Sequence, residues 1–185
     1  MFGSRERLTR FDMSEFSTPY SVLRLVGDNF FSDGLLTAAI RREPFGVLLF
    51  DEIEKAHSTF FDFLLQILSE GRLTDAQGKL ANFCSTIIIM TSNIGAQSLI
   101  SNPIGWLQSM NKEVIKEHFM TEVQKYFRPE LFNRIDQVVP FSPLDSFTVR
   151  FVVEREIALL REREGIKFRR INLSIEEDVL GLLAQ

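Results

Sequence analysis

"VLLFDEIEKAH", residues 47–57, is the stretch that decides the fold of this 185-residue chain. Its first four residues, Val47–Phe50, are an apolar run without alternation, which is typical of a strand covered on both faces of a parallel sheet. Two adjacent acids, Asp51 and Glu52, follow the run directly. Ligands of open parallel sheets bind outside the carboxyl ends of the strands, so these carboxylates stand where a ligand site is expected. The pattern alone is equally compatible with acids that only end the strand and cap the next helix.

Strand-like and helix-like segments alternate around this run. Further strands are predicted at residues 7–13, 85–93 and 135–141, the last two as buried strands. Helices are predicted over residues 33–44, which Pro44 ends, over residues 57–71, and around a third apolar stripe. The stripe of the second helix is Phe61, Leu64, Leu65 and Leu68, and that of the third is Ile115, Phe119, Val123 and Phe127. This alternation predicts an α/β fold with a largely parallel sheet.

The character of the chain changes after "SPLD", residues 142–145. Asp145 can cap a helix that carries apolar residues up to Leu160, and a short extended piece follows. Ser174 and Glu177 have the spacing of a capping box for a last helix. We therefore expect an α/β subdomain over residues 1–142 and the beginning of a small helical subdomain over residues 143–185, with the boundary near Phe141–Leu144.

Composition excludes several classes of function. The net charge is −4 and no dense block of Lys and Arg occurs, which argues against nucleic-acid binding as the main activity. The single cysteine, Cys84, fits a reducing compartment, and we expect it to be a small buried residue beside a strand. No apolar run approaches the roughly 18 residues of a membrane span. These observations predict a cytoplasmic protein that binds neither nucleic acid nor membrane.

The residue types at the strand ends suit phosphate chemistry. Two carboxylates at one position can hold a hydrated magnesium ion and orient an attacking water, the two roles that phosphoanhydride hydrolysis needs. Magnesium prefers oxygen ligands and keeps several waters, so one carboxylate plus nucleotide phosphates suffices. Asn93 ends the buried strand at residues 85–93 and is expected at the same edge of the sheet.

Several motifs occur in the order found in Clp-type AAA+ ATPases. They are "LLFDEIEKAH", "LLQILSEGRLTDAQG", "TIIIMTSNIG" and "FRPELFNRIDQVVPF", and the resemblance covers essentially the whole chain. More narrowly, the chain resembles the second ATPase module of ClpB-like and ClpA-like protein unfoldases. The resemblance implies a P-loop-type parallel sheet followed by a small helical lid. It also implies hydrolysis of ATP with Mg²⁺ in a hexameric homo-oligomeric ring that remodels or unfolds polypeptide substrates, and it leaves a partner protease open.

By this resemblance, three strand-end residues have assigned roles. Asp51 is the Walker B aspartate, which binds magnesium through water, and Glu52 is the catalytic glutamate that polarises the attacking water. Asn93 resembles the sensor residue that helps to hold that water near the γ-phosphate.

Arg134, in "FNRID", matches the arginine finger that reaches the nucleotide of the neighbouring subunit. A finger supplied in trans stabilises the charge of the transferring phosphoryl group. Arg128 is the second candidate, and the alternative for it is an ion pair with Glu130 or another nearby acid.

The chain departs from the family at both ends. The phosphate-cradling sequence GxxxxGK[ST] does not occur in it. The resemblance places Met1 inside or just after the helix that follows this loop, so the first strand of the family's sheet is missing, and the lid would continue beyond Gln185. We expect either a piece of a full ATPase, inactive and without tight ATP binding by itself, or a short protein without its own nucleotide site. The second reading makes it a non-catalytic interaction module; an ATPase acting on DNA is a third reading, which the acidic balance opposes.

A third departure lies at residues 26–36, where the family carries a longer loop with an aromatic residue between glycine and valine that grips substrate in the ring pore. Phe30 and Phe31 are the aromatic residues of this chain at that place. They are candidates for an aromatic grip on polypeptide, and packing into the core or a subunit interface is the open alternative.

Overall fold

The computed structural model describes residues 7–27, 33–96, 98, 112–141, 144, 146–169, 179 and 181. The chain divides into two compact units, Met1–Pro140 and Phe141–Gln185. Among the described residues, no helix has the length and apolar character needed to cross a membrane.

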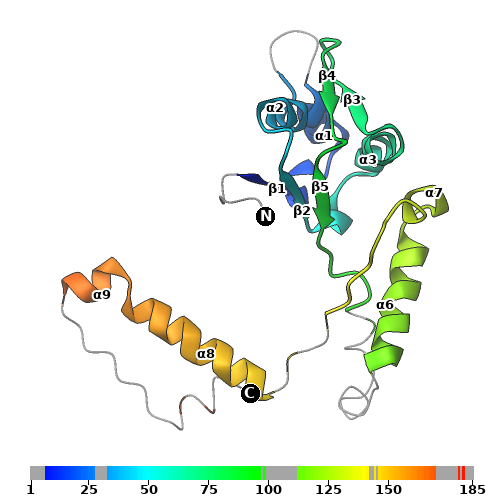
Figure 1. Cartoon of the computed structure of the whole chain (residues 1–185). Helices are drawn as coiled ribbons and strands as arrows, with labels where there is room; N and C mark the ends of the chain where they lie inside the picture. Colours follow the sequence, from blue (N-terminus) through cyan, green and yellow to red (C-terminus); the bar gives the residue numbers. More distant parts are fainter. Residues whose placement is uncertain are drawn as a thin grey trace. The chain divides into compact units, whose positions relative to one another are not determined.

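The first unit is built on a three-stranded parallel sheet (Figure 1). Its strands are β1 (Leu8–Asp12), β2 (Val47–Asp51) and β5 (Ile87–Met90), in the order β1-β2-β5. Asp12 is the partner of Asp51 and Phe50 is the partner of Met90, so the carboxyl ends of all three strands meet at one edge. The α/β class predicted from the sequence is confirmed.

The described residues cover only one face of this sheet. Leu48 and Phe50 are fully buried, and Phe50 packs against Phe60 with a ring-centroid distance of 5.1 Å. On the opposite face, Ile87 and Ile89 are each 45% exposed. The prediction that the strands are buried on both faces is therefore wrong for the described part of the chain, because its helices pack on the face that carries Leu48 and Phe50.

Two α-helices in the first half of the chain begin at side-chain caps, one of them at His57, whose side chain accepts a hydrogen bond from Thr59 N. Thr18 and Ser21 form a capping box for α1 (Pro19–Val26), in which Pro19 occupies the first turn. The other elements of this half are the 3₁₀ helices η2 (Met13–Phe16) and η3 (Ile53–Lys55), and the helices α2 (Leu35–Arg42) and α3 (Ser58–Glu70).

The buried stripe of α3 differs in part from the prediction. Its buried residues are Phe60, Leu64 and Ile67, while Phe61, Leu65 and Leu68 are partly buried against the core. Of the predicted stripe, only Leu64 is fully buried. The helix packs against α1, β3 and α7, so its contacts spread over more than one stripe. Phe61 and Leu65 line a cavity of about 220 Å³ together with residues of α6 (Lys112–Tyr126) and α7 (Pro129–Phe132).

Residues 135–141 do not form the strand predicted for them; after the bend at Asp136 their backbone is irregular. A strand requires a partner for its backbone groups, and within the described residues this segment pairs neither with β5 nor with any other strand. By contrast, the predicted apolar stripe of α6 is confirmed: Ile115 and Phe127 are buried, and Phe119 and Val123 are partly buried.

A two-stranded hairpin follows α3 and was not predicted. Its strands β3 (Arg72–Thr74) and β4 (Leu80–Asn82) pair antiparallel, with Leu73 opposite Ala81. Gly71, at φ +65°, ends α3 in the left-handed conformation, and a Cβ there would lie 2.6 Å from the Sγ of Cys84. Cys84 is exposed, so the expectation that it is buried beside a strand is wrong.

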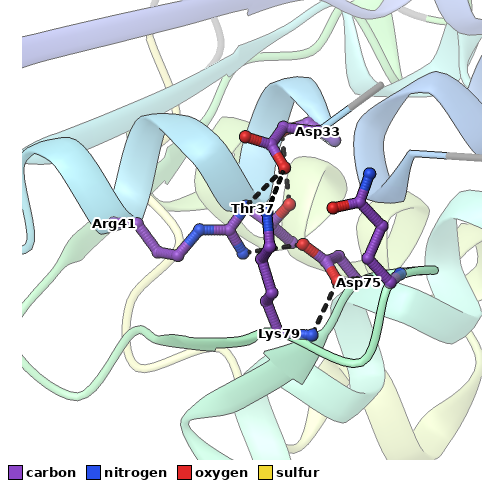
Figure 2. A network of polar contacts seen from close by, with 7 residues as sticks. Asp33, Thr37, Arg41, Asp75 and Lys79 are labelled. Atoms are coloured by element: carbon purple, nitrogen blue, oxygen red, sulfur yellow. Dashed lines mark hydrogen bonds and ion pairs between the residues drawn. The ribbon is translucent and has the colours of Figure 1, made fainter. Parts of the chain in front are cut away.

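A polar network ties this hairpin to α2 (Figure 2). Asp75 in the hairpin turn accepts hydrogen bonds from the backbone nitrogens of Gln77 and Lys79, and its side chain is 1% exposed. Arg41 Nη1 lies 2.9 Å from Asp75 Oδ2. Asp33, just before α2, lies 3.0 Å from Lys79 Nζ and 3.7 Å from Arg41 Nη2. These contacts, drawn in Figure 2, join the residue before α2, α2 itself and the hairpin turn, so the network fixes the turn against α2.

The second unit contains α8 (Ser146–Arg161) and α9 (Glu164–Phe168). The predicted helix up to Leu160 is thus present as α8, and Phe147 and Phe151 on it are exposed. The predicted cap at Asp145, the extended piece and the helix after Ser174 lie outside the described residues, apart from isolated positions.

Candidate active site

Asp51, the last residue of β2, is held by groups from both neighbouring strands. Arg10 on β1 is opposite Leu49, so side-chain alternation places Arg10 on the same face as Asp51. The Arg10 guanidinium forms an ion pair with Asp51 Oδ2, and the hydroxyl of Thr91 donates a hydrogen bond to Asp51 Oδ1. The Thr91 hydrogen bond and the Arg10 contact outweigh the opposing effect of partial burial and lower the pKa of Asp51 below its ordinary value. Asp51 is therefore a carboxylate at neutral pH.

Glu52 has an unusual backbone conformation. Its φ of 55° and ψ of 53° make it the one non-glycine residue of the described chain with a positive φ. This conformation costs roughly 1–2 kcal/mol for a residue with a Cβ, and such strain concentrates at functional sites. Two hydrogen bonds maintain it: Glu52 N donates to Thr91 Oγ1 at 3.2 Å, and Ile53 N donates to Thr91 O at 3.0 Å.

Asn93 follows β5 at the same edge of the sheet. Since β2 and β5 are paired in parallel and Phe50 is opposite Met90, the segments after both strands leave the sheet side by side. Glu54 joins them, because its carboxylate accepts hydrogen bonds from Ser92 Oγ at 2.7 Å and from Asn93 N at 3.3 Å. The structure thus brings the segments of Asp51, Glu52 and Asn93 together, as the sequence predicted.

The arginine candidates lie elsewhere in the first unit. Arg134 is in the turn after α7, where its backbone nitrogen donates to Leu131 O at 3.0 Å. Its side chain is exposed and has no ion-pair or hydrogen-bond partner among the described residues. Arg128 Nη1 forms an ion pair with Asp62 Oδ1 on α3 at 2.8 Å. The alternative of a nearby acid therefore holds for Arg128, and that acid is Asp62, not Glu130.

Phe30 and Phe31, the candidate substrate-gripping residues, lie outside the described residues. Two residues with central contacts were not assigned a role from the sequence, namely Arg10 and Thr91. Arg10 could have been found from alternation in residues 7–13, since it sits on the same strand face as Asp12. For Thr91, the polar end of the strand at residues 85–93 was the available signal.

The donor set fits part of a magnesium–nucleotide site. An ionised carboxylate at Asp51 and oxygen donors at Glu52 and Asn93 are the hard ligands that Mg²⁺ prefers. Within the described residues, no cluster of three or more His, Cys, Asp or Glu side chains could hold a metal by itself. A magnesium ion here would therefore depend on water and phosphate oxygens, and the GxxxxGK[ST] sequence that cradles phosphates is not among the 185 residues.

A parallel α/β sheet with an Asp-Glu pair at the end of one strand and an Asn shortly after the neighbouring strand is the arrangement expected of an AAA-type domain. The chain belongs to this family: the family model described as "AAA domain (Cdc48 subfamily)" matches residues 1–138.

The relatives that the chain matches are named as ClpB chaperones. The chain is 43% identical over 194 residues to "Probable chaperone protein ClpB 1" of Chlorobaculum tepidum, covering 100% of this chain and 44% of that protein. It is 42% identical over 190 residues to the ClpB chaperone of Dichelobacter nodosus, covering 100% of this chain and 21% of that protein. It is 40% identical over 189 residues to "Chaperone protein ClpB3, chloroplastic" of Arabidopsis thaliana, covering 99% of this chain and 20% of that protein. The predicted resemblance to Clp-type AAA+ proteins is confirmed, and the chain spans less than half the length of these relatives.

Proposed function

We propose that this chain is the hydrolytic part of an ATP-dependent Clp-type chaperone, in which a hexameric ring of copies hydrolyses ATP to remodel or unfold polypeptide substrates. Membership of the AAA family implies nucleotide use, and its relatives are named ClpB chaperones. The observation that carries the proposal is the meeting of Asp51, Glu52 and Asn93 at the carboxyl ends of two paired parallel strands. A cytoplasmic location fits the single cysteine of the chain.

Each strand-end residue has a defined task in this proposal. Asp51, ionised and fixed by Thr91, holds the water shell of Mg²⁺, which supplies charge neutralisation at the phosphates when bound. Glu52 accepts a hydrogen bond from the attacking water and draws its proton. The Asn93 amide orients that water. The strained backbone of Glu52 supports the assignment, since backbone strain of this kind concentrates at functional sites.

The first prediction concerns Glu52→Gln in the protein expressed from its natural reading frame. The amide keeps the size of the side chain but cannot take a proton, so nucleotide binding should be retained while turnover falls by roughly 100-fold or more. Steady-state phosphate release and binding of a fluorescent ATP analogue measure the two effects. Sustained hydrolysis by the variant would contradict the assignment.

A non-catalytic interaction module is the second candidate, because the chain contains no phosphate-cradling loop sequence and Arg10 engages Asp51. The DNA in frame upstream of the Met1 codon separates the two candidates. An open frame that encodes GxxxxGK[ST] supports the ATPase, and a stop codon there favours the interaction module.

A further inference from the structure

We propose that Glu54 is a positioning residue, whose carboxylate fixes the turn after β5 so that the Asn93 amide is held toward the hydrolysis site. The inference rests on the proposed function, since it assigns a task to a residue next to Glu52 in the same site. Glu54 lies two residues beyond Glu52 and touches no reacting group itself.

The first argument is that both carboxylate oxygens of Glu54 accept hydrogen bonds from the segment after β5. Oε2 accepts the hydrogen bond from Ser92 Oγ at 2.7 Å, and Oε1 accepts the one from Asn93 N at 3.3 Å. Ser92 Oγ in turn accepts a hydrogen bond from Ile94 N at 3.0 Å. The Glu54 carboxylate therefore contacts the segment Ser92–Ile94 directly at Asn93 N and through the Ser92 hydroxyl.

The second argument is that the backbone of Glu54 is itself fixed. Glu54 lies in η3, whose first residue, Ile53, is fully buried in the core. The phenol of Tyr126 on α6 donates a hydrogen bond to Glu54 O at 3.2 Å. Burial and the negative charge of Glu54 raise the pKa of Tyr126, so its hydroxyl remains a donor. The carboxylate is thus attached to a fixed support.

Tyr126 is itself part of an aromatic cluster between α3 and the end of α6. Tyr126 packs edge-on against Phe61 at a ring-centroid distance of 6.1 Å and against Phe127 at 5.1 Å. Phe61 in turn packs against Phe60 of the buried core at 6.0 Å. The backbone carbonyl of Glu54 is thus hydrogen-bonded to a ring that packs against the aromatic side chains of Phe61 and Phe127.

The third argument is the contrast between the backbone and the side chain of Asn93. The backbone nitrogen is bound by Glu54, and the carbonyl accepts from Ala96 N at 3.1 Å. Its side chain is exposed and makes no hydrogen bond to any described residue. A fixed backbone with an unengaged amide is the arrangement expected of a residue that contacts a ligand.

The experiment compares variants in the full-length protein that carries this chain. Glu54→Ala removes both acceptors, so we expect kcat for ATP to fall roughly 10- to 100-fold with KM within about twofold, because misplacement of an orienting group affects the transition state most. Glu54→Gln keeps one acceptor for Ser92 and should recover part of kcat. Glu70→Gln is the control: it neutralises an exposed carboxylate whose partner is Arg72 and not a strand-end residue, and it should leave both constants unchanged.

Unchanged kcat in Glu54→Ala overturns the inference. If that variant does not fold, Ser92→Ala decides. It removes the shorter of the two hydrogen bonds to Glu54 together with the bond that Ser92 Oγ accepts from Ile94 N, and it should lower kcat in the same direction. Wild-type kcat there overturns the inference as well. Amide hydrogen exchange at Asn93 and Ile94 should accelerate in Glu54→Ala.

Glu52→Gln in the same preparations separates the two hypotheses. Loss of turnover in Glu52→Gln together with normal kcat in Glu54→Ala refutes the positioning role alone. Continued turnover in Glu52→Gln refutes the proposed function, and the positioning role with it.

Discussion

At the scale of single residues, Thr91 has the largest influence on the strand-end acids. Its hydroxyl donates to Asp51 Oδ1 and accepts from Glu52 N, and its carbonyl accepts from Ile53 N. The same residue therefore lowers the pKa of Asp51 and stabilises the left-handed backbone of Glu52. Because Thr91 sits on the chain segment after β5, these effects depend on the correct pairing of β5 with β2.

Replacing Thr91 by valine tests this dual role. Valine has nearly the same shape but no hydroxyl, so the pKa of Asp51 should rise toward the usual value of about 3.9. A titration of the Asp51 carboxyl carbon by NMR measures the change. Thr86→Val is the control, since the Thr86 hydroxyl donates to Pro44 O and touches neither acid. An Asp51 pKa that does not move in Thr91→Val would contradict the role.

At the scale of elements, the polar network between α2 and the β3–β4 hairpin is the most consequential contact. Burial acts to raise the pKa of Asp75, but the hydrogen bond from Lys79 N, the ion pair with the Arg41 guanidinium and the hydrogen bond from Gln77 N outweigh it and lower the pKa. A group with a lowered pKa stabilises the fold above its unfolded-state pKa of about 3.9. That stabilisation is lost as the pH falls through the lower value of the folded state.

Asp75→Asn should reduce the free energy of unfolding of the chain by about 2–3 kcal/mol at pH 7, because it leaves Arg41 without its buried partner. The difference from the wild type should shrink below about pH 4, where Asp75 of the unfolded wild type becomes protonated before Asp75 of the folded state does. Urea unfolding followed by circular dichroism at pH 7 and pH 3 measures both values. Asp62→Asn, which breaks the exposed pair with Arg128, should cost at most about 1 kcal/mol. Equal losses in the two variants would argue against a special role of the network.

Comparison of the predicted and observed elements shows which of them the sequence pattern identifies. The strand that begins at Val47 was predicted from an uninterrupted apolar run, and the α6 stripe was predicted from apolar residues at helical spacing. The hairpin was missed because strands of three residues are too short to show a period. The strand at residues 135–141 was predicted wrongly because local pattern cannot tell whether a pairing partner exists. In the same way, the Asp51–Glu52 pair was found from its position, whereas the contacts of Arg10, Thr91 and Glu54 arise from strand register.

At the scale of the whole molecule, the position of Arg134 bears on assembly. Its side chain is exposed in the turn after α7 and contacts none of the described strand-end groups. An arginine that acts in its own site should be held near that site by its surroundings. The arrangement therefore supports the proposal that Arg134 acts on the nucleotide of a neighbouring copy in a ring.

Mixed rings test this arrangement in the intact protein. Arg134→Ala alone should lower hydrolysis by roughly 1,000-fold or more, as expected for loss of an arginine finger. Mixing it with Glu52→Gln subunits should restore part of the activity, because these subunits donate their own Arg134 to sites that retain Glu52. Arg72→Ala serves as the control for loss of an exposed arginine. Failure of the two inactive variants to complement each other would argue against action between subunits.

The one-sided covering of the sheet has an electrostatic consequence. Alternation places the exposed Ile87 and Ile89 on the same sheet face as Leu49, and hence on the face of Arg10 and Asp51. Any segment that covers these isoleucines also lowers the dielectric constant around the neighbouring ion pair. Coulomb attraction grows as the dielectric constant falls, so Arg10 would hold Asp51 more tightly beneath such a cover. Packing on Ile87 and Ile89 therefore also strengthens the ion pair that favours the charged form of Asp51.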